Sequence, residues 1–114
     1  MKVKQITSDG IIFEDGSKLF SDHLQDCCGH HWLDFEHIKL EDFDGLEFDL
    51  SSDSFFNPID GYGIELDPIH GYSVKIPGYG SNNGYYSSEL TLVLVDPNGN
   101  EKRFDISDCQ VISD

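Results

Sequence analysis

Short apolar runs separated by turn residues are the feature that most constrains the fold of this 114-residue chain. Asp9-Gly10 and Asp15-Gly16 each lie between two such runs. An Asp-Gly pair in that setting is typical of a β-hairpin turn. The sequence therefore predicts a three-stranded meander over residues 1–21. Its expected strands are Val3–Thr7, Ile11–Glu14 and Lys18–Phe20.

The second half of the chain repeats this pattern. Leu90, Leu92 and Leu94 recur at every second position, which is the period of a strand with one buried face. We therefore expect a strand over Tyr86–Val95, a turn at Asp96–Gly99 and a returning strand over Lys102–Ile106. Four shorter strands are predicted at Leu46–Leu50, Ile64–Leu66, Tyr72–Ile76 and Cys109–Ile112, with loops at Ser51–Gly63 and Gly78–Gly84.

One segment has a helical character instead. Asp22 is a suitable helix N-cap, and Gln25 follows it in capping-box position. The apolar residues between Trp32 and Ile38 have a partly helical spacing, which Gly29 weakens. We expect one short helical segment around residues 22–39. The order of elements then predicts an α+β fold, mainly antiparallel β, in a single domain over residues 1–114.

The charge of the chain restricts its partners. Asp and Glu total 22, Lys and Arg total 7, and the formal net charge is −15. Such a chain is repelled by nucleic acid and by anionic lipid, whereas it is attracted to basic protein surfaces. No apolar run reaches the roughly 18 residues of a membrane span, and no secretory segment opens the sequence. We therefore expect a cytoplasmic protein.

The acidic residues are concentrated in one region. Residues 34–67 hold half of the 22 acids against a single Lys39. The alternation over Leu46–Leu50 places its acids on a solvent-facing side. The candidate partner-binding residues are Glu41, Asp42, Asp44, Glu47, Asp49 and Asp53. The alternative is that this charge only keeps the protein soluble.

Metal-ligand residue types are concentrated between residues 23 and 31. The candidate ligands are His23, Asp26, Cys27, Cys28, His30 and His31, with Cys109 as a remote addition. On a helix, His23, Cys27 and His31 would share one face at i,i+4 spacing. Cys28 would join only if Gly29 breaks the helix. Cys and His in a four-coordinate shell favour a structural zinc ion. The alternative is that the thiols are small buried apolar residues.

The remaining chemistry is less well supported. Three Cys, two of them adjacent, do not make a disulfide framework, and the chain has few basic groups to activate a thiol. The enzymatic alternatives are a Cys27 nucleophile beside His23 or His31, and a catalytic zinc ion. Gly78–Gly84 has no Lys and opens no expected helix, which disfavours a phosphate loop. His37 and His70 are expected at or near the surface. We therefore expect no enzymatic activity.

Two sequence blocks resemble a known family. His23-x-Gln25-Asp26-Cys27-Cys28 and the block from Tyr79 to Ser87 resemble small acidic proteins of phages and prophages, over roughly residues 3–94. The resemblance implies a metal at His23, Asp26, Cys27 or Cys28, and a phage setting. It implies no enzyme, because the family has no assigned activity. This chain differs by having Gly29 where the family has Glu, and by adding the hairpin that carries Cys109.

A phage setting suggests a specific function. Small acidic phage proteins are often counter-defence factors, of which anti-CRISPR proteins are the best-known class. We therefore expect an inhibitor that docks its acidic surface on a basic region of a Cas9-type nuclease and blocks nucleic-acid loading. The alternatives are a small zinc or thiol enzyme of phage origin, or an acidic structural or assembly protein. The sequence leaves the oligomeric state open.

Overall fold

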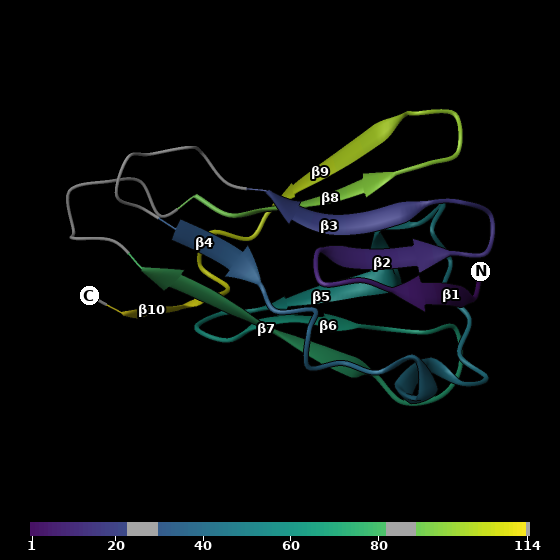
Figure 1. Cartoon of the computed structure of the whole chain (residues 1–114), viewed down its shortest axis with the longest axis horizontal. Helices are drawn as coiled ribbons and strands as arrows, with labels where there is room; N and C mark the ends of the chain where they lie inside the picture. The colour runs from purple at the N-terminus through teal and green to yellow at the C-terminus, as the bar shows by residue number, and fades with distance from the viewer. Residues whose placement is uncertain (23–29, 82–88, 114) are drawn as a thin grey trace.

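Two β-sheets pack face to face in the computed structural model of the chain (Figure 1). The structure describes residues 1–22, 30–81 and 89–113, and of His30 and Ser113 it describes only the backbone. The first sheet has the strand order β1-β2-β3-β8-β9 within these residues. All of its strand pairs are antiparallel. The strands are β1 (Val3–Ile6), β2 (Gly10–Phe13), β3 (Lys18–Asp22), β8 (Thr91–Val95) and β9 (Glu101–Asp105).

The predicted meander and the predicted hairpin at Asp96–Gly99 are confirmed in this sheet. The amide of Ser17 donates to the Asp15 carboxylate at 2.8 Å, and Gly16 adopts a φ of 93°. Only glycine takes that conformation without strain, which explains the Asp-Gly signal. In the β8–β9 turn, the Asp96 carboxylate accepts bonds from the amides of Asn98 and Asn100, each at 2.9 Å.

The second sheet has the order β10-β7-β6-β5, and β4 also pairs with β7. Its strands are β4 (His30–Leu33), β5 (Phe56–Ile59), β6 (Gly63–Leu66), β7 (Val74–Ser81) and β10 (Val111–Ser113). The pairs are antiparallel except for β10 with β7, which is parallel. β4 also reaches the first sheet, because the amide of Leu33 donates to the Ser21 hydroxyl of β3 at 3.0 Å.

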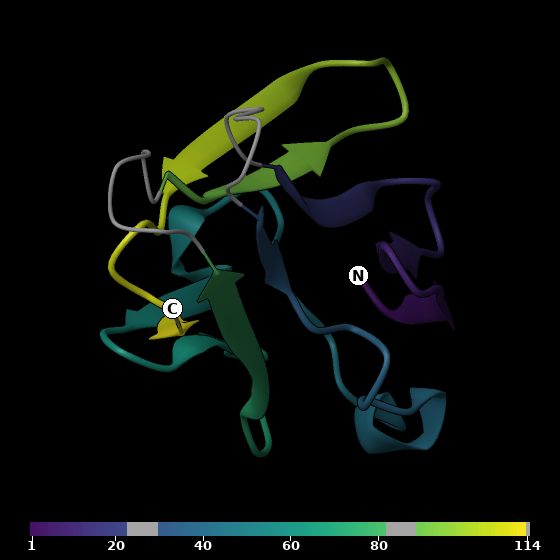
Figure 2. The same ribbon diagram turned by 60° about the vertical axis from the view of Figure 1, so that its left-hand side comes forward.

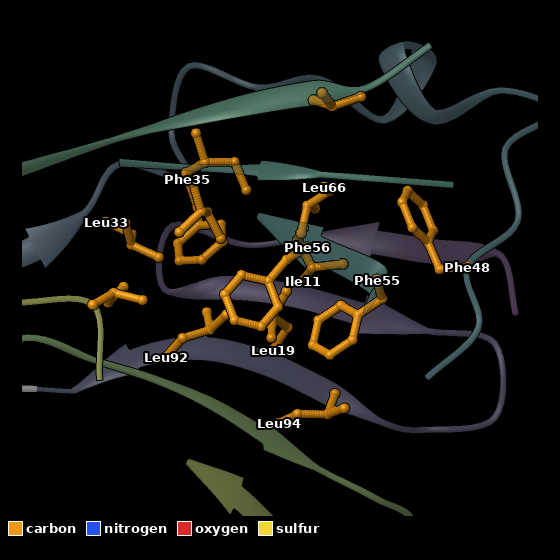
Figure 3. Close-up of a cluster of buried hydrophobic side chains, with 14 of the residues drawn as sticks. Ile11, Leu19, Leu33, Phe35, Phe48, Phe55, Phe56, Leu66, Leu92 and Leu94 are labelled. Atoms are coloured by element: carbon orange, nitrogen blue, oxygen red, sulfur yellow. The ribbon is translucent and has the colours of Figure 1, made fainter. Parts of the chain in front are cut away.

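The hydrophobic core lies between the two sheets. Figure 3 shows Ile11, Leu19 and Leu92 of the first sheet facing Phe56 and Leu66 of the second. Five of the eight Phe residues of the chain are less than 5% exposed: Phe13, Phe35, Phe43, Phe48 and Phe55. Each fully buried Leu, Ile or Phe contributes roughly 1.5–3 kcal/mol. Aromatic burial therefore accounts for much of the driving force in this small domain.

The expectation of helix around residues 22–39 is wrong for the part that the structure describes. Residues 30–33 form β4, in which His31 and Leu33 are buried while Trp32 is exposed. That alternation has the period of a strand, which pairing with β7 stabilises. The helical elements among the described residues are two short 3-10 turns, η1 (Leu40–Phe43) and η2 (Asp53–Phe55). None of the described helices is long and apolar enough to cross a membrane. Over the described residues the fold is mainly antiparallel β, as predicted, and the helical part of the expected α+β fold is reduced to these two turns.

Three loop and strand predictions are also corrected. Leu46–Leu50 alternates between buried and exposed residues but forms no strand, because its backbone bonds are isolated ones, such as Phe48 N–H to Met1 O at 2.8 Å. Ser51–Gly63, predicted as loop, contains η2 and β5. Gly78–Ser81, also predicted as loop, belongs to β7.

Candidate functional site

An extended acidic segment follows β4 in the chain and covers one end of the molecule. Figure 2 shows η1 at the end opposite the β8–β9 hairpin. Phe43, Leu46 and Phe48 are buried, whereas Glu41 and Glu47 are exposed. The predicted separation of apolar and acidic side chains therefore holds, although the segment is not a strand. The buried side chains fix the backbone, so that the carboxylates project from a packed surface.

A second loop packs against this segment. The hydroxyl of Tyr72 donates to the Asp42 carbonyl at 2.8 Å, and the amide of Ile69 donates to the Glu47 carbonyl at 2.8 Å. Tyr72 and Ile69 are nonetheless 58% and 53% exposed. Apolar and aromatic groups thus lie among carboxylates. We call this region the η1 surface, and it consists of Leu40, Glu41, Asp42, Asp44, Glu47, Ile69 and Tyr72.

The two remaining predicted partner-binding acids lie near positive charge. Lys102 of β9 lies 3.5 Å from the Asp53 carboxylate. Hydrogen bonds from the Ser51 hydroxyl and amide lower the pKa of Asp49, and the N-terminal amino group and Lys102 act in the same direction. Glu41 also has a cation nearby, because its carboxylate lies 4.0 Å from the Lys39 ammonium. The structure therefore carries Glu41, Asp42, Asp44 and Glu47 on one packed segment, and brings Asp49 and Asp53 near Lys102.

His31 is the predicted metal ligand whose surroundings are best defined. It is 2% exposed, and its Nδ1 lies 2.8 Å from Oε1 of Gln110. The other end of that amide, Nε2, donates to the Ser107 carbonyl at 2.8 Å. Because a carbonyl only accepts, Oε1 must face His31, and Nδ1 must carry the proton. In a neutral ring of this tautomer the lone pair is at Nε2, the atom through which such an imidazole binds a metal.

The other predicted ligands are less defined. His23, Asp26, Cys27 and Cys28 lie outside the described residues. His30 begins β4, and its side chain is also outside the description. The helical spacing that grouped His30 and His31 with Cys27 does not extend to these two residues, because both belong to a strand. Within residues 1–22, 30–81 and 89–113, no three His, Cys, Asp or Glu side chains form a group that could hold a metal.

Cys109 is part of the hydrophobic core. It is 2% exposed, and burial raises the pKa of its thiol, with a smaller contribution from the Asp60 carboxylate. In this environment the thiol holds its proton at neutral pH and behaves as a small apolar side chain. Cys109 directly precedes Gln110, so the same turn of chain positions the buried thiol and the partner of His31.

Sequence reasoning missed an aromatic pair on the outer side of the second sheet. Trp32 of β4 and Tyr79 of β7 are cross-strand neighbours, each 37% exposed, and their ring centroids lie 5.8 Å apart. Beyond β4 the chain turns, and His37 pairs with Asp34 at 2.7 Å. His37 and His70 are exposed, as expected. The signal that could have found this pair is the alternation of buried and exposed residues over residues 31–33. The partly helical spacing of the apolar residues after Trp32 suggested a helix instead.

Comparison with protein-family models, with curated proteins and with solved structures finds no match for this chain. The resemblance to phage proteins therefore stays a sequence-based prediction. The features of the molecule that bear on its function are its charge, the η1 surface and the surroundings of His31.

Proposed function

We propose that this protein is a non-enzymatic inhibitor that docks its η1 surface on a basic surface of another protein. The supporting observation is that Tyr72 and Ile69 are exposed among carboxylates, while the Tyr72 hydroxyl and the Ile69 amide are hydrogen-bonded to carbonyls of the acidic segment. Protein interfaces combine an apolar centre with a polar rim, and Tyr is enriched among the residues that dominate binding energy. The net charge of −15 would steer the encounter.

The most concrete partner is a Cas9-type nuclease. Such enzymes hold a guide–target heteroduplex in a positively charged channel, which an acidic protein surface can occupy in place of nucleic acid. A protein docked there blocks nucleic-acid loading without any chemistry of its own. This proposal combines the acidic surface with the resemblance to phage proteins, and it places the protein in the cytoplasm of a bacterial host.

We also propose a structural zinc ion with His31 as one ligand. The proton on Nδ1, fixed by Gln110, leaves Nε2 as the coordinating atom. His31 follows directly on the sequence segment that carries His23, Asp26, Cys27, Cys28 and His30. Zinc bound there would stabilise a segment that has little local structural preference of its own.

The docking proposal is tested with a variant of three η1-surface acids, Glu41→Gln, Asp44→Asn and Glu47→Gln. Asp42 is kept because its carboxylate accepts a bond from the Lys39 amide at 3.0 Å. The matched control neutralises three exposed acids elsewhere, Glu14→Gln, Asp60→Asn and Asp108→Asn. Association with a Cas9-type nuclease is measured over a range of salt concentrations. We expect the η1 variant to associate about tenfold more slowly at low salt, and the control to lose much less.

A second variant tests the apolar centre of the surface. Tyr72→Ala should raise the dissociation rate with little change in its salt dependence, because it removes a contact rather than a charge. If the η1 variant and its control associate equally fast, net charge alone acts and the η1 surface is not the docking site. If wild type binds no Cas9-type nuclease, the proposed partner is wrong.

A further inference from the structure

A groove runs beside Trp32, where β4 meets the first sheet. Two adjoining hollows of about 470 and 600 Å³ share Ser8, Trp32 and Glu36 among their lining residues. The β1–β2 turn forms one wall, and the chain beyond β4 forms another. We call this the Trp32 groove, and its polar and aromatic lining includes Ser8, Asp9, Trp32, Asp34, Glu36 and Tyr79.

The groove combines aromatic faces with negative charge. Asp9, Asp34 and Glu36 line it, and no Lys or Arg of the described segments does so. Asp34 is engaged, because its carboxylate pairs with His37 and accepts a bond from the Glu36 amide at 3.0 Å. Glu36 is exposed and has no cation paired with it within the described part of the chain. The groove therefore offers a carboxylate to an incoming positive charge.

This combination selects a guanidinium group. Arginine is planar, stacks on aromatic faces and forms two parallel hydrogen bonds with a carboxylate. Lysine offers only a compact, strongly hydrated point charge. Trp is the aromatic residue that binds cations best, and Tyr79 extends the aromatic surface beside it.

We propose that the Trp32 groove binds an arginine side chain of a basic partner protein. The guanidinium stacks on the Trp32–Tyr79 pair and donates to the Glu36 carboxylate. The inference rests on the proposed function in taking the partner to be a basic protein, but it concerns a separate surface. The η1 surface supplies steering and area, whereas the groove supplies one oriented anchor.

The fluorescence of Trp32 reports on this site directly, because it is the single Trp of the chain. The probe is a capped peptide of alternating Gly and Arg, titrated against the full-length protein. Its control is the same peptide with citrulline, which keeps the shape of arginine and removes its charge. We expect the arginine peptide to shift the Trp32 emission and to bind about tenfold more tightly than the citrulline peptide.

Two variants separate this site from general attraction to an acidic protein. Glu36→Gln should weaken the arginine peptide about tenfold, whereas Glu14→Gln, an equal charge change outside the groove, should weaken it no more than about twofold. Tyr79→Leu should also weaken binding, and Tyr79→Phe should preserve it because the ring remains. Thermal unfolding of each variant verifies that it is folded.

The outcomes distinguish the groove from the η1 surface. Equal binding of arginine and citrulline peptides, or equal losses in Glu36→Gln and Glu14→Gln, would overturn the groove proposal. If the protein binds the arginine peptide but no Cas9-type nuclease, the proposed partner is wrong and the groove proposal is supported. If the nuclease binds and Glu36→Gln and Tyr79→Leu associate and dissociate as wild type does, the groove is not part of that interface.

Discussion

The tautomer of His31 is set by two hydrogen bonds in series. The Ser107 carbonyl orients the amide of Gln110, and that amide orients the proton on Nδ1 of His31. All of this happens in a buried site, where an unsatisfied polar group costs about 1–3 kcal/mol. A buried histidine held in one tautomer is suited to a metal ligand, and the same bonds position its ring.

A zinc ion held by His31 and Cys27 would be detected in the metal content of the protein. Untagged wild type should carry one zinc ion per chain by mass spectrometry, and Cys27→Ser and His31→Gln should lose it. Gln110→Ala should retain zinc but release it to a chelator about 10–100-fold more readily, because the ring loses its orienting partner. His70→Gln, which changes an exposed histidine, should keep wild-type zinc. Wild type without metal would contradict the zinc proposal.

At the scale of elements, three strands converge on Gly80. His31 of β4 pairs opposite it, and Ile112 of β10 pairs with it on the other side. A Cβ at this position would lie within 2.3 Å of both His31 Nδ1 and Gln110 Oε1. The glycine in β7 is therefore a requirement of packing, because the side chains from two neighbouring elements occupy the space above its backbone.

Gly80→Ala should destabilise the protein by about 1–3 kcal/mol, the usual cost of overpacking a closed site. Urea unfolding measures the change. Ser81→Ala, at the next and exposed position of β7, is the control and should stay within about 0.5 kcal/mol of wild type. If Gly80→Ala is as stable as wild type, the His31–Gln110 pair is not as tightly confined as the structure has it.

At the scale of the whole molecule, the net negative charge opposes folding and would favour association with a basic partner. The formal net charge is −15, and the exposed ion pairs of the described residues, such as Arg103 with Asp22 at 3.3 Å, offset little of it. Folding brings these carboxylates closer together than they are in the unfolded chain. The same negative charge disfavours self-association, and it would attract the basic partner surface proposed above.

Added salt should therefore stabilise the protein. At 0.1 M salt, exposed charges more than about 10 Å apart are largely screened from one another, and the distance shortens as salt is added. The Tm should therefore rise by about 4–8 °C between low salt and about 0.5 M NaCl, a gain of about 1 kcal/mol. Differential scanning calorimetry measures this. The variant lacking the charges of Glu41, Asp44 and Glu47 should show a smaller rise. A Tm that falls with salt would mean that attractive ion pairs outweigh the repulsion.

The sequence predicts those features of this protein that local chemistry controls. The Asp15-Gly16 turn, the period-two leucines of β8 and the alternation of acids with buried Leu46 and Phe48 depend on neighbouring residues alone. For that reason the meander, the β8–β9 hairpin and the exposed acids agree with prediction. The concentration of ligand types at residues 23–28 lies outside the described structure and stays a prediction.

Tertiary structure decides what depends on distant partners. Pairing with β7 makes a strand of His30–Leu33, where spacing alone suggested a helix. Neighbouring residues leave no room for a side chain at Gly78 or Gly80, so these two glycines lie within β7 although they suggested a loop. The partnership of His31 with Gln110, 79 positions away, and the meeting of Trp32 with Tyr79 have no local signal. Contacts between residues far apart in sequence form only when the whole chain packs, and in this protein those contacts build both the His31 site and the Trp32 groove.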